Sequence, residues 1–217
     1  MLYQKKDPTK IHWKYSDKGK LSRQKIWLKA QYGLSLDDYS ELLTKQNNKC
    51  AICATSESDH QSGRFLVDHN HDTGEVRGIL CNSCNSGIGF FNDDKEKLSN
   101  AIKYLDRDIS FIQEFINNQK KKLLPEEKFP EDRSLKNRYG IVKITFNKIL
   151  EAQNNSCGIC YTKTPGGKGN SFHVDHCHIS DKIRGLLCVR CNLGLGALKD
   201  SKDVVSKAMN YLGDDSD

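Results

Sequence analysis

The chain has 217 residues, of which 36% are hydrophobic and 29% are charged, and its formal net charge is +6. This length suits one large domain or two small ones, and the polar composition is typical of a protein that works in water. No apolar run approaches the ~18 residues of a membrane span and no signal peptide follows Met1, so we expect an intracellular, cytoplasmic protein whose clustered cysteines bind metal rather than form disulfides.

The positive charge is concentrated at the start of the chain. Residues 1–30 hold nine Lys or Arg against two Asp, so the remaining residues together are nearly neutral. Trp13, Tyr15 and Trp27 lie among these lysines, and aromatic rings beside cations favour contact with nucleic acid. The alternative is a solvated tail that keeps the protein in solution. We assign residues 1–19 to a basic N-terminal arm.

Most of the chain is an internal repeat with a period of 107 residues. The stretch "VDHNHDTGEVRGILCNSCNSGIG" at 67–89 returns as "VDHCHISDKIRGLLCVRCNLGLG" at 174–196, and 17 of the 40 positions from 50 to 89 are identical in the second copy. Such self-similarity indicates a duplicated module. We place the two copies at residues 20–105 and 134–217, with a linker at 106–133.

Each copy is expected to begin with a helix. In the first copy Ser35 and Asp38 have the spacing of a capping box, and the apolar residues that follow share one helical face. The second copy lacks the cap but keeps apolar spacing at Ile144, Phe146, Ile149 and Leu150. The later elements are strands near 64–70 and 75–80 (matching 172–178 and 182–187), a short helix near Cys84 and a helix from about Asp94 to Leu105.

The linker contains a further helical pattern. Apolar residues from Ile109 to Ile116 have helical spacing, and Pro125 and Pro130 then predict a charged hinge. The predicted fold class is therefore α+β, with two tandem modules that are mostly helical outside their two-stranded hairpins and are joined by a helical linker.

Eight of the nine cysteines form two sets of paired knuckles. Each set suits one tetrahedral zinc ion with no open ligand position, so we predict two structural zinc ions, with an iron–sulfur cluster as the alternative. The sets are Cys50, Cys53, Cys81 and Cys84, and Cys157, Cys160, Cys188 and Cys191. The ninth, Cys177, is expected to be a small strand residue rather than a ligand or nucleophile.

Each predicted hairpin carries a group of polar residues. The group comprises Asp68, His69, His71 and Asn85 in the first copy and Asp175, His176, His178 and Asn192 in the second. A neutral histidine can take a proton from water near pH 7, and Asp and Asn oxygens suit Mg²⁺, which keeps waters and binds phosphate. The alternative is a pair of surface histidines beside a structural aspartate. Retention of the group in both copies, while neighbouring residues change, favours the catalytic interpretation.

The order of these motifs resembles the endonuclease VII branch of the HNH, or ββα-metal, nucleases. The motifs are "CAIC", "VDHNH" and "VRGILCNSCN" in the first copy and "CGIC", "VDHCH" and "IRGLLCVRCN" in the second. The resemblance implies that Asp68 and Asn85 hold a catalytic Mg²⁺ or Mn²⁺ ion beside the general base His69. Matched residues of the second copy imply the same roles for Asp175, Asn192 and His176.

The resemblance also bears on residues around these groups. It implies that His71 and His178 support the site near the scissile phosphate. Arg77 and Arg184 are expected either to contact phosphate or to be ion-paired. One departure is that Ile88 and Leu195 stand where the phage resolvase endonuclease VII has an acidic residue. That resolvase is also a homodimer with one motif per chain.

These features predict a metal-dependent DNA endonuclease with two active sites in one chain. The sites would cut both strands of duplex or branched DNA, one strand per module, and no further oligomer is required to pair them. Three alternatives stay open: a sequence-specific restriction or homing-type enzyme, a nonspecific or nicking nuclease, and an inactive zinc-stabilised nucleic-acid-binding protein. The family resemblance further implies a phage or mobile-element origin.

Overall fold

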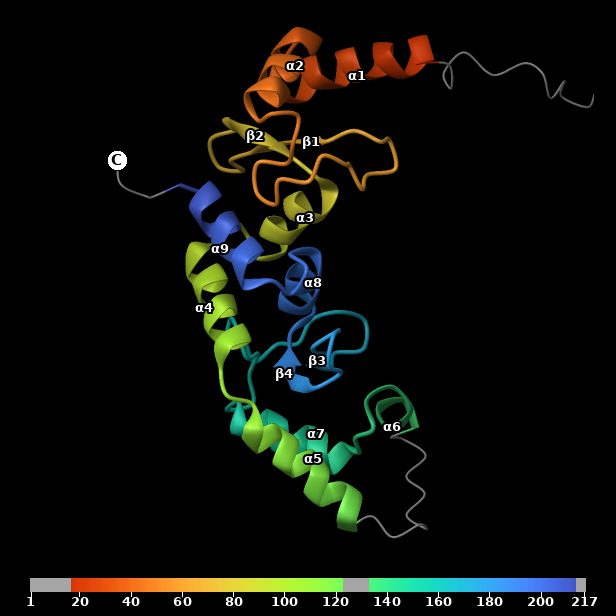
Figure 1. Ribbon diagram of the computed structural model, residues 1–217, viewed down its shortest axis with the longest axis vertical. Coiled ribbons are helices and arrows are strands. Elements are labelled where there is room, and N and C mark those ends of the chain that lie inside the picture. Colours follow the sequence, from red (N-terminus) through yellow and green to blue (C-terminus); the bar gives the residue numbers. More distant parts are fainter. Residues whose placement is uncertain (1–16, 123–132, 214–217) are drawn as a thin grey trace, which may run out of the picture. The chain divides into compact units, whose positions relative to one another are not determined.

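The computed structural model describes residues 17–122 and 133–213. The predicted α+β class is confirmed, because the described chain is mostly helical with two small antiparallel hairpins (Figure 1). In chain order the elements are α1 (Asp17–Tyr32), α2 (Leu36–Lys45), β1 (Leu66–His69), β2 (Val76–Leu80), α3 (Asn82–Phe90), α4 (Lys95–Asp106), α5 (Ser110–Lys122), α6 (Arg133–Tyr139), α7 (Lys143–Ala152), β3 (His173–His176), β4 (Ile183–Leu187), α8 (Val189–Ala197) and α9 (Lys202–Tyr211).

Two sequence predictions fall outside the described residues. They are most of the basic arm, including Trp13 and Tyr15, and the hinge that contains Pro125 and Pro130. Within the described ranges, no helix combines the length and the apolar character that a membrane crossing needs.

The chain divides into two compact units, one ending at Cys81 and the other beginning at Asn82. In the first unit a core of Leu28, Tyr39, Val67 and Ile79 joins α1 and α2 to the β1–β2 hairpin. Burial of such side chains contributes roughly 1.5–3 kcal/mol each, which is the main force that holds this hairpin in place.

The helix predicted at the start of each repeat is α2 in the first copy and α7 in the second, but another helix that was not predicted, α1 or α6, precedes it. The capping box of α2 forms as the sequence indicates. The Ser35 hydroxyl accepts a hydrogen bond from the Asp38 amide at 3.0 Å, and the Asp38 carboxylate accepts one from the Ser35 amide at 2.7 Å. The matching helix α7 has no side-chain cap. One residue was placed on the wrong face: Ile144 is 49% exposed, and the neighbouring Thr145 is buried instead. The reason is that, at about 100° per residue, Phe146 and Ile149 lie about 200° and 140° around the helix from Ile144, so Ile144 points away from the face that they bury.

In the second unit, equivalent helices of the two repeats pack against each other. Helix α3 contacts α8, and α4 contacts α9 (Figure 1). The contacts are reciprocal: a Cβ atom at Gly87 would lie 2.7 Å from Leu198, and one at Gly194 would lie 2.6 Å from Phe91. Both glycines therefore permit a close approach that alanine would block. Gly87 matches Gly194 in the repeat, and Leu198 matches Phe91, so the same contact is made twice. The interface therefore resembles that of a symmetric dimer.

The connecting helix in the linker is confirmed as α5. Ile112 and Ile116 are buried, and the helix contacts α7 and β4. The Gln113 side chain donates a hydrogen bond to the Ile183 carbonyl at 2.8 Å. The linker is therefore packed against the second hairpin over its described helical part.

Candidate active site

The eight predicted zinc ligands form two clusters. In each, the four Sγ atoms lie within 4.8 Å of one another, and in the described part of the chain no other group of three or more His, Cys, Asp or Glu ligand atoms is so close. The clusters are Cys50, Cys53, Cys81 and Cys84, and Cys157, Cys160, Cys188 and Cys191. Four thiolates in this arrangement could hold a structural zinc ion. Cys177 belongs to neither cluster, and it follows β3 rather than lying on the strand as predicted.

In the second cluster, contacts among the four sulfurs lower the pKa of two thiols, Cys160 and Cys188, and raise the pKa of the other two, Cys157 and Cys191. Hydrogen bonds from Cys157 and Cys191 lower the pKa of the Cys188 thiol to about 7, although Cys160 raises it. A hydrogen bond from Cys157 likewise holds the pKa of Cys160 far below its usual range. Because thiolates rather than thiols bind zinc, these contacts favour the ligand form at Cys160 and Cys188 only.

A glutamine ties each cysteine knuckle to its hairpin. Gln153 donates from Nε2 to the Leu186 carbonyl at 2.7 Å and accepts from the Leu186 amide at 2.8 Å. Gln46 makes the same pair of bonds to Ile79, at 2.8 and 2.9 Å. The side-chain amide thus pairs with the backbone N–H and C=O of one strand residue, as a residue of a neighbouring strand would. In both repeats this contact positions the end of the first helix against the strand that leads to the second cysteine pair.

A bulge in each hairpin brings an arginine to the predicted aspartate. Asp68 pairs with Gly78 and His69 with Val76, so Arg77 is left between two paired residues. Its guanidinium donates to both oxygens of Asp68, at 2.7 and 3.1 Å. Such bulges redirect a side chain locally. The ion-paired alternative for this arginine is therefore observed, and a contact with phosphate stays a prediction.

The second hairpin has the same bulge, and its arginine belongs to a polar network. Arg184 donates to the two oxygens of Asp175 at 2.6 and 2.8 Å and to Asp200 at 3.0 Å. The other oxygen of Asp200 lies 2.8 Å from Nδ1 of His178. Although burial lowers the pKa of Arg184, its bonds and charge interactions with Asp175 and Asp200 raise that pKa above the usual value. The network therefore holds a permanent cation between two carboxylates.

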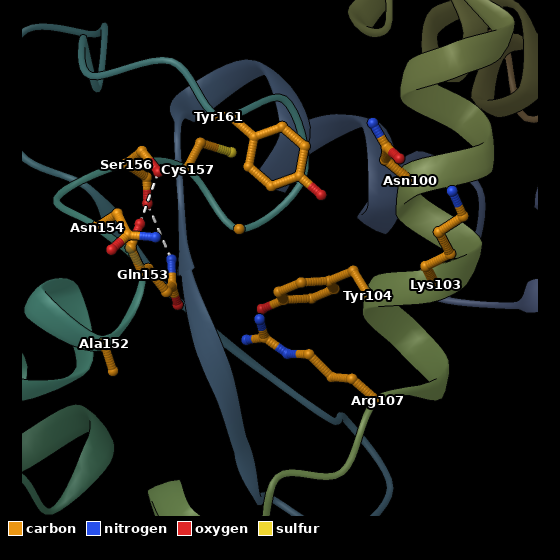
Figure 2. Close-up of a pocket in the computed structure, with 11 residues that line it drawn as sticks. Asn100, Lys103, Tyr104, Arg107, Ala152, Gln153, Asn154, Ser156, Cys157 and Tyr161 are labelled. Atoms are coloured by element: carbon orange, nitrogen blue, oxygen red, sulfur yellow. Dashed lines mark hydrogen bonds between the residues drawn. The ribbon is translucent and has the colours of Figure 1, made fainter.

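Helix α4 of the first repeat completes this network. The Tyr104 hydroxyl donates a 2.8 Å hydrogen bond to Asp175, and Tyr104 itself is 3% exposed. Burial and the Asp175 charge raise the pKa of Tyr104 well above its usual value, so the phenol stays a donor. Figure 2 shows Arg107 beside the Tyr104 ring, with its guanidinium carbon 4.2 Å from the ring centroid. Arg107 also donates to the Arg184 carbonyl at 2.6 Å. The second hairpin is thus supported by side chains from the other repeat.

The predicted histidines share one face in both repeats. The rings of His69 and His71 are 4.8 Å apart, as are those of His176 and His178. A tyrosine lies edge-on against the first ring of each pair, with Tyr32 5.3 Å from His69 and Tyr139 5.7 Å from His176. The His178 side chain is 66% exposed, so this face is open to a substrate.

The residues of the second repeat fit a hard divalent cation. Asp175 is buried, and each of its oxygens accepts at least one protein hydrogen bond. An ionised carboxylate has about four lone-pair positions, so three donors leave one on Oδ1. Asn192 is half-buried on α8, which contacts both strands of the hairpin. One carboxylate and one amide suit Mg²⁺, which is usually held by few protein groups together with water and phosphate. Their roles, and those of Asp68 and Asn85, stay predictions.

Two residues of the network were missed from the sequence. Asp200 and Tyr104 have exact counterparts at Asp93 and Tyr211, 107 positions away. The presence of the same residue in both copies was a signal in the sequence that these positions matter. It did not identify their contacts, because Tyr104 and Asp175 are 71 positions apart and meet only through helix packing.

Replacing Tyr104 with phenylalanine is expected to lower the free energy of unfolding by about 1–3 kcal/mol, because the buried Asp175 carboxylate loses a donor while the ring is kept. Thermal and denaturant unfolding would measure the change. The matched control is Tyr161→Phe, since Tyr161 is 63% exposed and its hydroxyl has no partner among the described residues. Equal stability of the two variants would contradict a supporting role for the Tyr104 hydroxyl.

Comparison with known proteins agrees with this geometry. The Gene 59 protein of Mycobacterium phage D29 is 40% identical over 77 residues, and that of Mycobacterium phage L5 is 39% identical over 77 residues. Each match covers 35% of this chain and 46% of the relative, so less than half of either relative is compared. No solved structure gives a significant match. The sequence profile described as recombination endonuclease VII matches twice, at residues 25–107 and 132–214, and the chain therefore belongs to the recombination endonuclease VII family.

Proposed function

We propose that the protein is a metal-dependent DNA endonuclease of the HNH type, with one active site in each repeat and one strand cut by each site. Membership in the endonuclease VII family supports a nuclease that acts on DNA. The observation that carries the two-site proposal is the matching arrangement of the hairpins. Each repeat holds an aspartate in an arginine ion pair at a bulge, followed by two histidines with adjacent rings.

In this mechanism His176 acts as the general base that accepts a proton from the attacking water. His178 lies beside it with Nδ1 next to Asp200, which leaves Nε2 available to a phosphate oxygen. Asp175 and Asn192 hold a Mg²⁺ or Mn²⁺ ion, which when bound stabilises the negative charge that develops on the phosphate and the leaving oxygen. His69, His71, Asp68 and Asn85 have the corresponding roles in the first repeat.

The ion pair with Arg184 has a separate role. It fixes the carboxylate of Asp175 through two parallel bonds and offsets part of its charge, so Asp175 can remain buried and ionised. A site held in this way loses little entropy when substrate arrives. Arg77 does the same for Asp68.

Incubation with supercoiled plasmid and Mg²⁺ tests the proposal directly. We expect linear product to form early, because two linked sites cut both strands within one encounter. The control is the same reaction without added divalent ion, since prolonged chelator treatment would also remove zinc. Nicked circles that accumulate before any linear product would contradict paired cutting, and an unchanged plasmid would contradict nuclease activity.

The setting of the reaction is part of the proposal. Both relatives come from mycobacteriophages, which supports a phage or mobile-element role inside a host cell. A panel of linear, bulged and branched duplexes would define the substrate, because the two sites must reach two strands at a fixed spacing. Preference for linear duplex alone would favour a restriction or homing-type enzyme.

A further inference from the structure

A cavity of about 370 Å³ lies beside the first hairpin, between α1 and β1. One wall is a single face of α1, because Lys20, Arg23, Gln24 and Trp27 follow the i, i+3, i+4, i+7 spacing of neighbours on a helix. The opposite wall is largely apolar and includes Phe65 from the segment before β1. The size lies within the range of pockets that bind small molecules or single nucleotides.

The rim of this cavity is cationic. Lys20, Arg23 and Arg64 line it, and no Asp or Glu is among its described lining residues. Lys20 pairs with Asp17 at 3.3 Å and Arg64 donates to the side chain of Gln24. Arg23 makes no hydrogen bond or ion pair with any other residue that the structure describes. A cavity with this charge favours an anionic ligand.

The α1 wall carries an exposed aromatic ring. Trp27 is 45% exposed although it borders the cavity, and its ring lies 5.1 Å from that of Tyr32. Tyr32 in turn contacts His69, the candidate general base, at 5.3 Å. The cavity is therefore two ring contacts away from the first catalytic histidine. An exposed indole beside cations is the combination that binds an unstacked nucleobase and its phosphate.

We propose that this cavity is a nucleotide subsite of the first active site, which takes one unpaired nucleotide of the DNA substrate. The base packs on Trp27, and the phosphodiester lies at Lys20, Arg23 and Arg64. This inference rests on the proposed DNA endonuclease function. An unpaired nucleotide is required because bases within an intact duplex are stacked on their neighbours and do not present a free face.

The subsite belongs to the first repeat alone. The positions that match Lys20, Arg23, Trp27 and Arg64 in the second repeat are occupied by Glu127, Pro130, Ser134 and Ser171. The two repeats thus keep the same candidate catalytic residues but differ in this contact. The first repeat would hold the unpaired strand while both sites cut.

The fluorescence of Trp27 provides a direct test. The chain has two tryptophans, so Trp13→Phe leaves Trp27 as the single reporter, and it changes none of the described lining residues. With Ca²⁺ in place of Mg²⁺, titration with oligothymidylate is expected to quench Trp27 saturably, and a fully paired duplex should quench it much less. Trp27→Ala should weaken binding of oligothymidylate by roughly 5- to 100-fold, the usual effect of losing one stacking ring. Equal quenching by both DNAs, or none by either, would overturn the subsite.

Matched variants on the same helix separate the subsite from general charge. Arg23→Gln and Lys25→Gln each remove one cation, but only Arg23 lines the cavity. Ile26→Ala is the control for Trp27→Ala, because Ile26 is 67% exposed and lies outside it. We expect Arg23→Gln, and not Lys25→Gln, to reduce the salt dependence of oligothymidylate binding by about one counterion. Identical behaviour of the two variants would contradict the assignment.

Two further outcomes are informative. Deletion of residues 1–16 should leave the fluorescence of Trp27 unchanged in the absence of DNA, because a basic segment and a cationic rim repel each other. A change in fluorescence would identify the chain's own arm as the occupant of the cavity and overturn the proposal. Cleavage of supercoiled plasmid by the wild-type protein is scored separately. Failure of cleavage alone rejects the nuclease function, whereas failure of Trp27 quenching alone rejects the subsite.

Discussion

Replacing Cys191 with serine is expected to release one of the two zinc ions and to unfold much of the second unit. Cys191 is 2% exposed on α8, and its Sγ is one of four clustered sulfurs. Structural zinc contributes about 10–16 kcal/mol of apparent binding free energy, whereas a whole domain is stable by only about 5–15 kcal/mol. Losing one ligand therefore removes more stability than this unit can lose. Zinc content after acid release and the thermal unfolding curve measure both effects.

The ninth cysteine provides the control for this prediction. Cys177 lies outside both clusters, so Cys177→Ser should keep two zinc ions and the melting temperature of the wild-type chain. The same comparison tests the iron–sulfur alternative, because the purified protein should contain zinc and no iron. A Cys191→Ser variant with full zinc content and unchanged unfolding would show that the cluster does not hold a structural ion.

Replacing His176 with alanine is expected to convert the enzyme into a nicking nuclease. Loss of a general base lowers the rate of its step by about 10²–10⁴-fold, so one strand would still be cut at the first site. His69→Ala should give the complementary nicking enzyme, and the double variant should lose both activities. The ratio of nicked to linear plasmid over time, at saturating Mg²⁺, separates these cases.

His173 is the matched control on the same strand. It begins β3 and is exposed, but it is not one of the residues retained between the repeats. His173→Ala should therefore linearise plasmid at the wild-type rate. If His176→Ala also did so, the assignment of one strand to each site would be wrong. If both variants lost activity equally, the loss would reflect damage to β3 rather than removal of a base.

The local elements were predictable because their signals lie within a few residues. The capping box at Ser35 depends on neighbours in the chain, and helix α2 begins there; the helix predicted from about Asp94 to Leu105 is likewise observed as α4. The cysteine clusters were predictable for a related reason, because two closely spaced cysteine pairs are the usual way in which a chain supplies four thiolates to one metal ion. The cysteine pairs recur in the second copy, whereas the capping box does not.

The surroundings of the candidate active sites were less predictable. Alternation along a strand suggests that Asp68 and His69 point to opposite faces, but it gives no indication of the bulge at Arg77. A bulge depends on which residues of the partner strand pair, and that register is a property of the hairpin as a whole. The resulting ion pair is one of the two roles that had been left open for the arginine.

The amino-acid sequence by itself determined the duplication, the helix–hairpin–helix–helix order that begins at α2 and at α7, the two cysteine sets and the family of the protein, but not the helices α1 and α6. These features follow from the spacing of residues that are close in the chain and from the recurrence of the same residues 107 positions later. Only the tertiary structure decided that α4 packs against α9 and that Tyr104 of one repeat holds Asp175 of the other. A helical pattern encodes which face is buried, but not which distant partner covers it, because burial free energy depends on apolar area and not on the identity of the covering element.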